Sequence, residues 1–362
     1  MLYKIRMIGG IEKMNMYVEK LPKILQDYFQ ILSPEFPNFL VEYIHTPEMQ
    51  KQSKISVTSG TIYSNMFDEI WYSSLDHSVA VALIIWNFTK DRKQTLSGLF
   101  HDIATPVFKH CIDFMNGDHE KQESTEELTT QIIENSKEIM TLLNRDEIKL
   151  EEVCDYHIYP IADNDTPKLS SDRLEYTLSN GLGVREKLWD LETVKEIYQD
   201  IEVQQDENGI QELGFKHKEI AEKFVNTMSK LSCIYVGNET KYSMQLIADI
   251  VKKMYEQHLV TKKDLYTLSE KEIIQKIENC PIGNLSNCFK KWEDATQIKE
   301  SDELPKDKYV VDIKVKQRYI VPLVEENNQF VRIDTISESA KKDINSFLNY
   351  KPKKYAYLDF NF

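Results

Sequence analysis

The sequence has few of the features that mark membrane and secreted proteins. Its longest apolar run is Val79 to Trp86, eight residues, against the roughly 20 that a helix needs to span a bilayer. The N-terminal stretch, MLYKIRMIGGIEKMNMYVEK, holds no continuous apolar segment, so we expect no signal peptide. The five cysteines are odd in number and form no CxxC pair, which favours reduced thiols over disulfides or a cysteine zinc site. These absences predict a cytoplasmic protein without a membrane-spanning segment.

The chain is also short of positive charge and of common nucleotide and hydrolase motifs. Its 45 lysines and arginines stand against 59 acidic residues, which leaves a formal net charge of −14. Such a chain has no overall field for a nucleic-acid backbone or an anionic membrane, although a local basic pocket is compatible with it. It contains no P-loop, no GxGxxG and no GxSxG sequence. We therefore expect no sequence-specific nucleic-acid binding and no site of these three kinds.

Glycine and proline are scarce, at 11 each among 362 residues, and long helices are the simplest consequence. Apolar periodicity predicts helices over residues 14–32, 68–86, 95–100, 124–143, 170–178, 218–233, 241–258, 269–279 and 285–292. Asn208-Gly209 predicts the turn of a hairpin over 199–214. Near the C-terminus, β-branched residues predict strands over 309–324, 330–336 and 355–362, with a helix over 337–348.

These patterns predict a mainly α fold with a small α+β C-terminal extension. We expect a helical body over residues 1–300, with its core motif region at 68–181, and the extension over 301–362.

Three polar features stand out: His77 at the start of the apolar stretch in SSLDHSVAVALIIW, His101-Asp102 at the end of the next predicted helix, and Asp172 near the start of the helix predicted over 170–178. Each is weak alone, since an HD pair arises readily by chance and such residues commonly cap helices. Together, two imidazoles and two carboxylates are a sensible ligand set for one divalent transition metal. Such a set leaves positions for water and a phosphate oxygen, and the metal would activate both.

The order H…HD…D resembles that of the HD-domain metal-dependent phosphohydrolases. HDIATPVFKH at 101–110 resembles the HDIGHGPFSH stretch of deoxynucleoside triphosphate triphosphohydrolase-like members. SDRLEYTLSNG at 171–181 resembles their D-R-x-D-Y segment. The resemblance covers about Asp68 to Gly181 and continues weakly to about residue 300. It implies an HD-domain helical bundle and hydrolysis of a phosphate ester or anhydride bond.

The resemblance also implies which residues hold the metal. His77, His101, Asp102 and Asp172 match the family's ligands and would bind one divalent ion, for which Mn, Fe, Ni, Zn and Mg all stay open. Asp102 thereby belongs to the catalytic set as well.

Two further histidines are candidate catalytic residues. His110 matches a family histidine that faces the substrate phosphates. His119, in GDHEKQEST at 117–125, is a candidate proton donor to the leaving oxygen, with a surface histidine as the alternative. The register is ambiguous here, because Gln122-Glu123 matches the family's H-E pair as well as His119-Glu120 does.

Three residues beside the proposed ligands are candidates for substrate binding. Lys109 would meet a phosphate, and Arg173 and Tyr176 would hold phosphate or sugar. The alternatives are a solvated lysine, a surface arginine and a core tyrosine.

Polar residues elsewhere carry weaker hypotheses. His157, Asp163 and Asp165 would line the mouth of the pocket or belong to a polar loop. In the C-terminal extension, the side chains of Lys314, Lys316 and Arg318 alternate and would share one face of a strand. That face would be an anion site, a subunit contact or simply solvated.

Two departures from the family pattern bear on the reaction. The triphosphohydrolase branch carries Arg where this chain has Ser74 and His where it has Thr105. Both losses bear on triphosphate cleavage more than on hydrolysis as such, because the proposed metal ligands are intact.

The sequence as a whole favours a metal-dependent phosphohydrolase that acts on a nucleotide, with deoxynucleoside triphosphates favoured by the resemblance. The alternatives are a phosphomonoesterase or cyclic-nucleotide phosphodiesterase, and a catalytically silent nucleotide-binding module. Homo-oligomers are common in this branch, so the resemblance leaves that assembly open.

Overall fold

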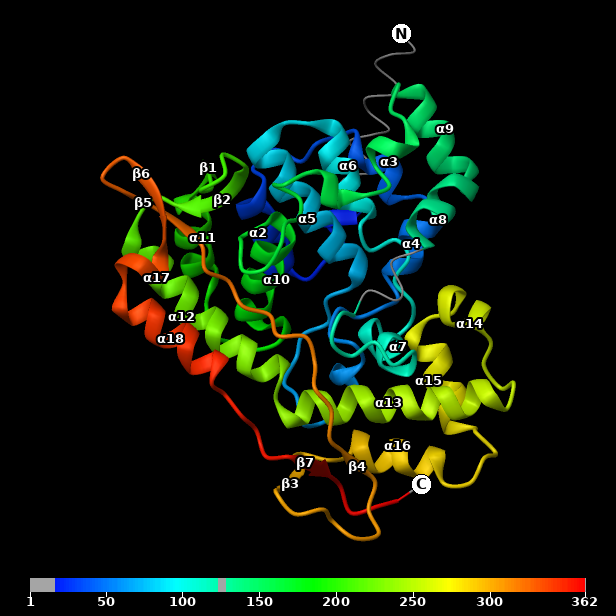
Figure 1. Cartoon of the computed structure of the whole chain (residues 1–362). Coiled ribbons are helices and arrows are strands. Elements are labelled where there is room, and N and C mark those ends of the chain that lie inside the picture. Colours follow the sequence, from blue (N-terminus) through cyan, green and yellow to red (C-terminus); the bar gives the residue numbers. More distant parts are fainter. Residues whose placement is uncertain (1–16, 123–127, 362) are drawn as a thin grey trace.

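A computed structural model describes residues 17–122 and 128–361, which form a mainly helical fold (Figure 1). The α-helices are α2 (Lys23–Leu32), α3 (Leu40–Ile44), α4 (Pro47–Gln52), α5 (Ser74–Thr89), α6 (Arg92–Phe100), α7 (His110–Met115), α8 (Thr129–Asn135), α9 (Lys137–Arg145), α10 (Ser171–Ser179), α11 (Leu191–Asp200), α12 (Lys218–Tyr235), α13 (Asn238–Glu256), α14 (Lys262–Thr267), α15 (Glu270–Glu278), α16 (Leu285–Glu293), α17 (Ile333–Ile336) and α18 (Glu338–Leu348). Short helical turns are η1 (Thr61–Tyr63), η3 (Leu150–Glu152), η4 (Tyr156–Ile158) and η5 (Asn180–Val184). The predicted fold class, mainly α with small sheets, is confirmed.

Two small sheets complete the fold. The strands are β1 (Ile201–Gln205), β2 (Gln211–Phe215), β3 (Lys299–Ser301), β4 (Val310–Val311), β5 (Leu323–Glu326), β6 (Gln329–Arg332) and β7 (Tyr355–Tyr357). One sheet has the order β1-β2-β5-β6, with β2 and β5 parallel and the other pairs antiparallel. The other has the antiparallel order β3-β7-β4. The hairpin predicted around Asn208-Gly209 is confirmed as β1 and β2.

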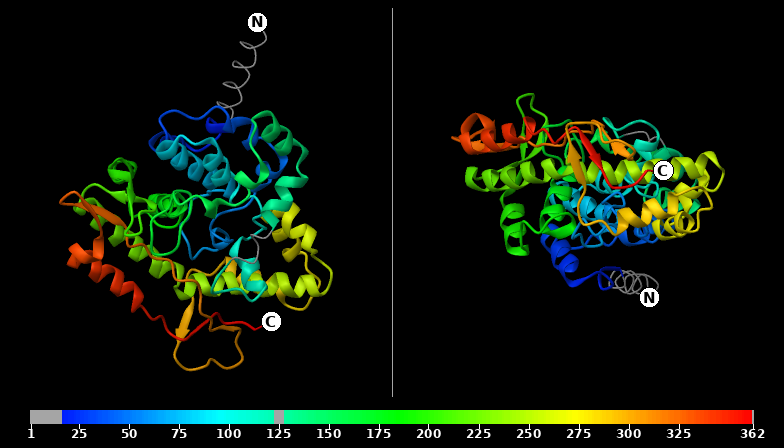
Figure 2. Two further views of the ribbon diagram at one scale, coloured as in Figure 1. Left: turned by 45° about the horizontal axis from the view of Figure 1, so that its top comes forward. Right: turned by 90° about the horizontal axis from the view of Figure 1, so that it is seen from below.

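The four-stranded sheet joins strands from both sides of residue 300. Strands β1 and β2 belong to the expected helical body, and β5 and β6 to the expected extension. Both views in Figure 2 place α18 beside α12, and β7 packs on α13. The division of the chain at residue 300 stays a prediction.

Helix α5 lies at the centre of the helical part (Figure 1). It is apolar on all sides and nearly all of it is buried, as expected for a helix surrounded by others. The Ser73 hydroxyl accepts from the Asp76 backbone, and the Asp76 carboxylate accepts from Ser73, which closes a capping box. The helix therefore begins at Ser74, and the prediction that it begins at Asp68 was wrong.

The strand predicted over 309–324 was wrong in its middle. Only β4 and the first residues of β5 pair there, and residues 312–322, which we call the strap, run between the two sheets outside any ladder. Ile320 and Val321 are buried, so the apolar pattern reflects packing against helices and not pairing with a strand. Similarly, the strand predicted over 330–336 ends at Arg332 and continues as α17.

Two large clusters of buried apolar side chains form most of the core, beside a small third cluster of Val81, Ile85 and Ala162. One large cluster gathers around α2, α5, α6, α10, α11 and α12, and the other around α7, α13, α15 and α16. Among the described helices, none is long and apolar enough to cross a membrane.

Candidate active site

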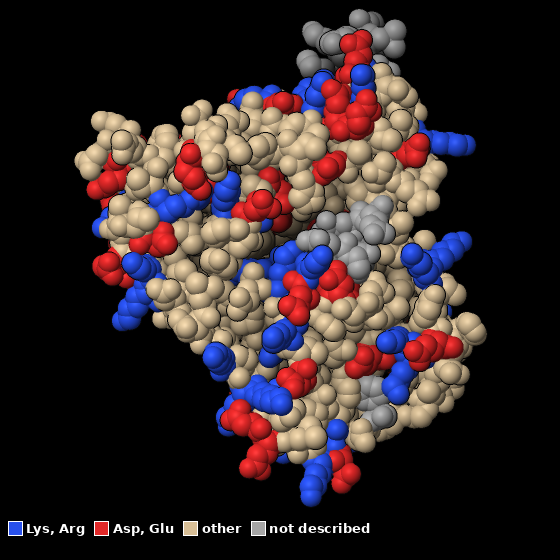
Figure 3. Space-filling view, in the orientation of Figure 1, with Lys and Arg blue, Asp and Glu red and all other residues tan. Residues whose placement is uncertain are grey.

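A cavity of about 510 Å³ lies where the two core clusters meet. Residues of α5, α7, α10, α13 and the strap line it, and Figure 3 shows a hollow near the middle of the face, bordered by basic and acidic side chains. Four of its lining residues are His77, His101, Asp102 and Asp172. The fold thus brings all four predicted metal ligands into one cavity.

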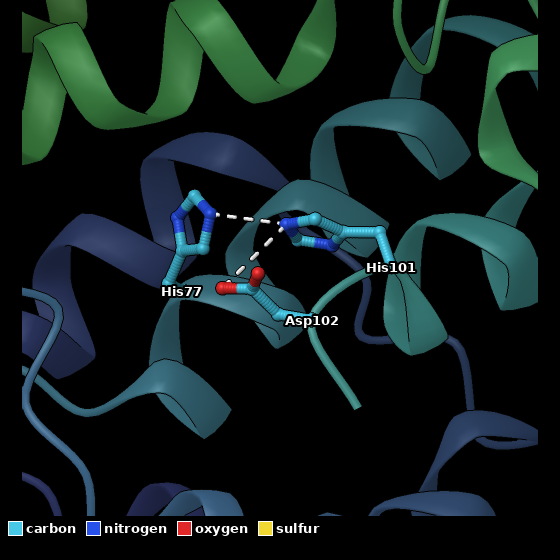
Figure 4. A group of neighbouring side chains, drawn as sticks. All are labelled: His77, His101 and Asp102. Atoms are coloured by element: carbon cyan, nitrogen blue, oxygen red, sulfur yellow. Dashed lines mark hydrogen bonds and ion pairs between the residues drawn. The ribbon is translucent and has the colours of Figure 1, made fainter. Parts of the chain in front are cut away.

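Three of these side chains form a compact group that can hold a metal ion. His77, His101 and Asp102 offer ligand atoms that all lie within 4.8 Å of one another (Figure 4). The two Nε2 atoms of the histidines are 3.2 Å apart, and His101 Nε2 lies 3.9 Å from Asp102 Oδ2. Asp172 joins from α10, with Oδ1 at 3.1 Å from His77 Nε2 and 3.8 Å from His101 Nε2.

Helix ends position these groups. His77 lies in the first turn of α5, His101 is the C-cap of α6, and Asp172 lies in the first turn of α10. Helix α5 packs on both α6 and α10, so the ends of three helices converge.

Hydrogen bonds orient both imidazoles toward the cavity. His101 Nδ1 lies 2.7 Å from the carbonyl oxygen of Gly98, and His77 Nδ1 contacts the carboxylate of Glu175. Since each Nδ1 donates its proton to an oxygen, Nε2 of each ring is the atom presented to the site.

Glu175 is a functional residue that sequence reasoning missed. Its side chain is fully buried, and it accepts hydrogen bonds from Tyr28 Oη at 3.1 Å and Tyr72 Oη at 2.8 Å. Its signal in the sequence is its spacing, because a residue three positions after Asp172 lies on the same helix face.

The distances within the group fit a shared metal ion. Two ligand atoms that are each about 2.1 Å from one ion lie at most about 4.2 Å apart. The four distances quoted above, His77–His101, His101–Asp102, His77–Asp172 and His101–Asp172, run from 3.1 to 3.9 Å and lie within that limit. Imidazole nitrogen and carboxylate oxygen are donors that suit divalent transition metals.

Neighbouring charges favour the charged forms of Asp102 and His77. Burial alone would raise the pKa of Asp102, but Lys109, with Nζ 2.5 Å from Asp102 Oδ2, and the two histidines hold it well below its usual range. Burial alone would lower the pKa of His77, but the Glu175 and Asp172 carboxylates raise it to about 10. Without a metal, therefore, His77 is protonated on both ring nitrogens and positively charged at neutral pH.

Lys109 is held in an unusual backbone conformation beside Asp102. It is the N-cap of α7 with φ 42°, it follows Phe108 with φ 59°, and only 9% of it is exposed. The lysine predicted as a phosphate contact therefore lies inside the cavity wall rather than in solvent.

His110 also lines the cavity. Its Nδ1 lies 3.0 Å from Asp113 Oδ2, and its Nε2 lies 3.4 Å from Arg318 Nη2. Burial lowers its pKa, so the ring is neutral and Nε2 faces the guanidinium of Arg318.

The ambiguous segment after α7 places Gln122 at the cavity. Gln122 lines it and its Oε1 accepts from Arg318 Nη2 at 2.7 Å. The ring of His119 packs edge-on against Phe114, and His119 is not among the lining residues. A role for His119 as a proton donor thus rests on the sequence resemblance alone, and Glu123 lies outside the described residues.

The residues predicted to bind substrate from α10 both line the cavity. Arg173 Nη1 donates to Asn164 Oδ1 at 2.6 Å and lies 3.5 Å from Asp163 Oδ1. The ring of Tyr176 packs edge-on against Tyr235, and burial raises its pKa to about 12.

The weaker hypotheses on the 157–165 loop and the C-terminal extension also have a structural outcome. His157, Asp163 and Asp165 line the cavity, and so do Lys316 and Arg318, whereas Lys314 is exposed and outside its lining.

The two departures from the family pattern occupy different places. Ser74 is fully buried and is not among the cavity-lining residues, so position 74 does not border the site. Thr105 lines a small adjoining cavity of about 30 Å³ with Asp102 and Lys109. Its carbonyl oxygen accepts from Lys51 Nζ at 2.5 Å, which anchors the loop after His101-Asp102.

The chain has distant relatives of similar length. No family model matches it. It is 21% identical over 292 residues to the uncharacterized protein YdhJ of Bacillus subtilis (strain 168), which covers 78% of this chain and 83% of YdhJ.

Two crystal structures have a similar fold. A hypothetical protein from Aquifex aeolicus has a TM-score of 0.57 and 14% identity, over 89% of this chain and 92% of that one. A phosphohydrolase from Bacteroides thetaiotaomicron has a TM-score of 0.57 and 12% identity, over 93% of this chain and 96% of that one. At these identities, the similarity establishes the shared fold.

Proposed function

We propose that this protein is a divalent-metal-dependent phosphohydrolase of the HD-domain superfamily that acts on a nucleotide. The observation that carries the proposal is the convergence of His77, His101 and Asp102, whose ligand atoms lie within 4.8 Å of one another, with Asp172 beside both histidines. The fold that the chain shares with a phosphohydrolase from Bacteroides thetaiotaomicron adds support.

The four side chains would hold the metal, and Glu175 would orient His77 toward it. When bound, a divalent ion supplies Lewis-acid activation of a phosphoryl group and of a water molecule. Beside this group, Lys109 offers an ammonium 2.5 Å from Asp102 Oδ2. Next to it, the neutral ring of His110 has an unprotonated Nε2, which would have to take up a proton before it could donate to a phosphate oxygen or to the departing oxygen.

Cavity size and lining support a nucleotide as substrate. A volume of about 510 Å³ falls within the roughly 300–1,000 Å³ of small-molecule sites. Tyr72, Tyr156, Tyr176 and Tyr235 line the cavity and offer apolar ring surface for a sugar or a base. Deoxynucleoside triphosphates are the substrates favoured by the resemblance.

A catalytically silent nucleotide-binding module is the second candidate. Thr105 stands where the resembling enzymes carry a histidine, and Lys109 occupies a carboxylate oxygen of Asp102 that a metal would need. A module of this kind would bind nucleotide with the metal group acting only as a binding site.

Product analysis distinguishes the two candidates. The metal-free protein is incubated with Mn²⁺ and a panel of nucleoside mono-, di- and triphosphates, cyclic nucleotides and a phosphomonoester, and products are resolved by ³¹P NMR. A hydrolase releases phosphate, pyrophosphate or triphosphate, and the product identifies the bond cut. Metal-dependent nucleotide binding without any product would instead support the silent module.

A further inference from the structure

The strap reaches the cavity, and backbone hydrogen bonds hold it on either side of Arg318. The backbone N–H of Lys316 donates to the carbonyl of His119 at 3.1 Å, and that of Val321 donates to the carbonyl of Pro167 at 2.8 Å. Between them, the carbonyl of Arg318 accepts from Ser232 Oγ on α12 at 2.5 Å. Figure 1 shows this segment crossing from the three-stranded to the four-stranded sheet. The C-terminal extension therefore supplies one wall of the site.

Lys316 and Arg318 are the strap side chains that line the cavity, and Arg318 lies beside His110. Its Nη2 donates to Gln122 Oε1 at 2.7 Å and lies 3.4 Å from His110 Nε2. His110 directly follows Lys109, which contacts Asp102. Going outward from the metal group, the cavity wall thus presents Lys109, His110 and then Arg318.

Other basic side chains near the cavity pair with carboxylates, whereas Arg318 contacts neutral groups. Lys109 pairs with Asp102, Arg173 with Asp163, and the buried Arg185 with Glu69. Within residues 17–122 and 128–361, the hydrogen-bonding partners of the Arg318 side chain are Gln122 and His110, both uncharged. A half-buried guanidinium with neutral partners favours an anionic ligand.

A phosphate group is the anion that fits this position. The guanidinium presents a planar fork of N–H donors that matches phosphate oxygens. The site also lies in a chain with net charge −14, where composition alone would not gather cations around a cavity.

Resting on the proposed function, we propose that Arg318 binds a substrate phosphate other than the one attacked at the metal. It thereby makes the site selective for nucleoside di- and triphosphates over monophosphates.

The test uses the full chain and two matched variants. Arg318→Gln removes a charge that lines the cavity, and Lys314→Gln removes one from the exposed part of the same strap. Binding of inorganic tripolyphosphate to the metal-free protein is measured by calorimetry. With Mn²⁺, kcat/KM is measured for a nucleoside triphosphate and its monophosphate.

We expect Arg318→Gln to weaken tripolyphosphate binding and to lower kcat/KM for the triphosphate, each by about tenfold or more, the scale of one charged hydrogen bond. In Arg318→Gln, kcat/KM for the monophosphate should change by less than about threefold. Lys314→Gln should match the wild type in both measurements. Arg318→Lys should restore part of what Arg318→Gln loses. Unfolding temperatures establish that each variant is folded.

Two results would overturn the proposal: tripolyphosphate binding by Arg318→Gln equal to that of Lys314→Gln, or an equal loss for triphosphate and monophosphate. The proposed function fails separately. If no nucleotide is hydrolysed but tripolyphosphate binding still depends on Arg318, the phosphate site stands and the hydrolase does not. If hydrolysis depends on the metal but not on Arg318, the hydrolase stands and this inference fails.

Discussion

His77 donates its Nδ1 proton to the buried carboxylate of Glu175, and this contact decides which ring nitrogen faces the cavity. Two tyrosine hydroxyls, from Tyr28 and Tyr72, in turn hold the Glu175 carboxylate in place. A histidine ligand whose second nitrogen donates to a carboxylate is more basic and better oriented than a free imidazole. Buried polar groups behind the cavity thus orient one of the side chains that line it.

Glu175→Gln should weaken the binding of Mn²⁺ by about 10- to 100-fold, the usual cost of losing such a supporting contact. The amide keeps the size of the side chain but removes its charge, so His77 is less basic. Calorimetric titration of the metal-free protein measures the affinity. Glu186→Gln, an exposed change shortly after α10, is the control, and equal affinities in the two variants would contradict the role given to Glu175.

Metal binding should release about one proton per ion near neutral pH. Glu175 and Asp172 raise the pKa of His77 to about 10 against the effect of burial, so the metal-free protein holds a proton that the metal must displace. Apparent affinity should therefore rise about tenfold per pH unit between about pH 7 and pH 8.5. Calorimetry in buffers of different ionisation enthalpy counts the protons, and an affinity independent of pH would contradict this charge state.

Lys109→Met should tighten metal binding, by about tenfold. The Lys109 ammonium lies 2.5 Å from Asp102 Oδ2 and competes with a metal for that oxygen. Methionine keeps the length of the side chain without the charge, and a change of one pKa unit at a carboxylate corresponds to about a factor of ten. Weaker metal binding in this variant would mean that Lys109 positions Asp102 and does not compete for it.

Glu270→Gln should remove a pH dependence of folding stability. Burial raises the pKa of Glu270 from 4.5 to about 7, so the folded state binds more protons than the unfolded state between these values. Wild-type stability should fall as pH rises from about 4.5 to 7, by about 3 kcal/mol from this group, because each pKa unit is worth about 1.4 kcal/mol.

Urea unfolding at a series of pH values, compared between wild type and Glu270→Gln, isolates this contribution. Burial lowers the pKa of the neighbouring Lys51 to about 7, so its contribution rises with pH above 7 and lies outside the window compared. Parallel wild-type and variant profiles between pH 4.5 and 7 would refute the assignment to Glu270.

Local signals in the sequence predicted much of the helical part. The helix predicted over 269–279 is confirmed as α15, which the capping box of Ser269 and Glu272 begins, and the Asn208-Gly209 turn is confirmed too, because each depends on contacts within a few residues. The beginning of α5 was missed, although the capping box of Ser73 and Asp76 that fixes it is also a local signal. The strap was mistaken for a strand, since β-branched residues suit any extended segment, and no strand within residues 17–122 and 128–361 pairs with it.

The sequence predicted those residues of the candidate site that belong to a recognisable motif. Spacing and resemblance selected His77, His101, Asp102 and Asp172, which the fold brings together. Glu175, which contacts His77, and Arg318, which contacts His110, belong to no such motif. Arg318 lies more than 200 residues from His110 in the sequence. Contacts between such distant positions follow from the packing of the C-terminal extension, which composition does not reveal.

A single titration tests the central claim most directly. Metal-free protein receives increasing Mn²⁺ in the presence of the nucleotide cleaved fastest, and product release is followed beside that of Asp102→Ala. The account predicts release that saturates at one ion per chain and is lost in the variant. Product release that needs no divalent ion, or that persists unchanged in Asp102→Ala, would contradict it.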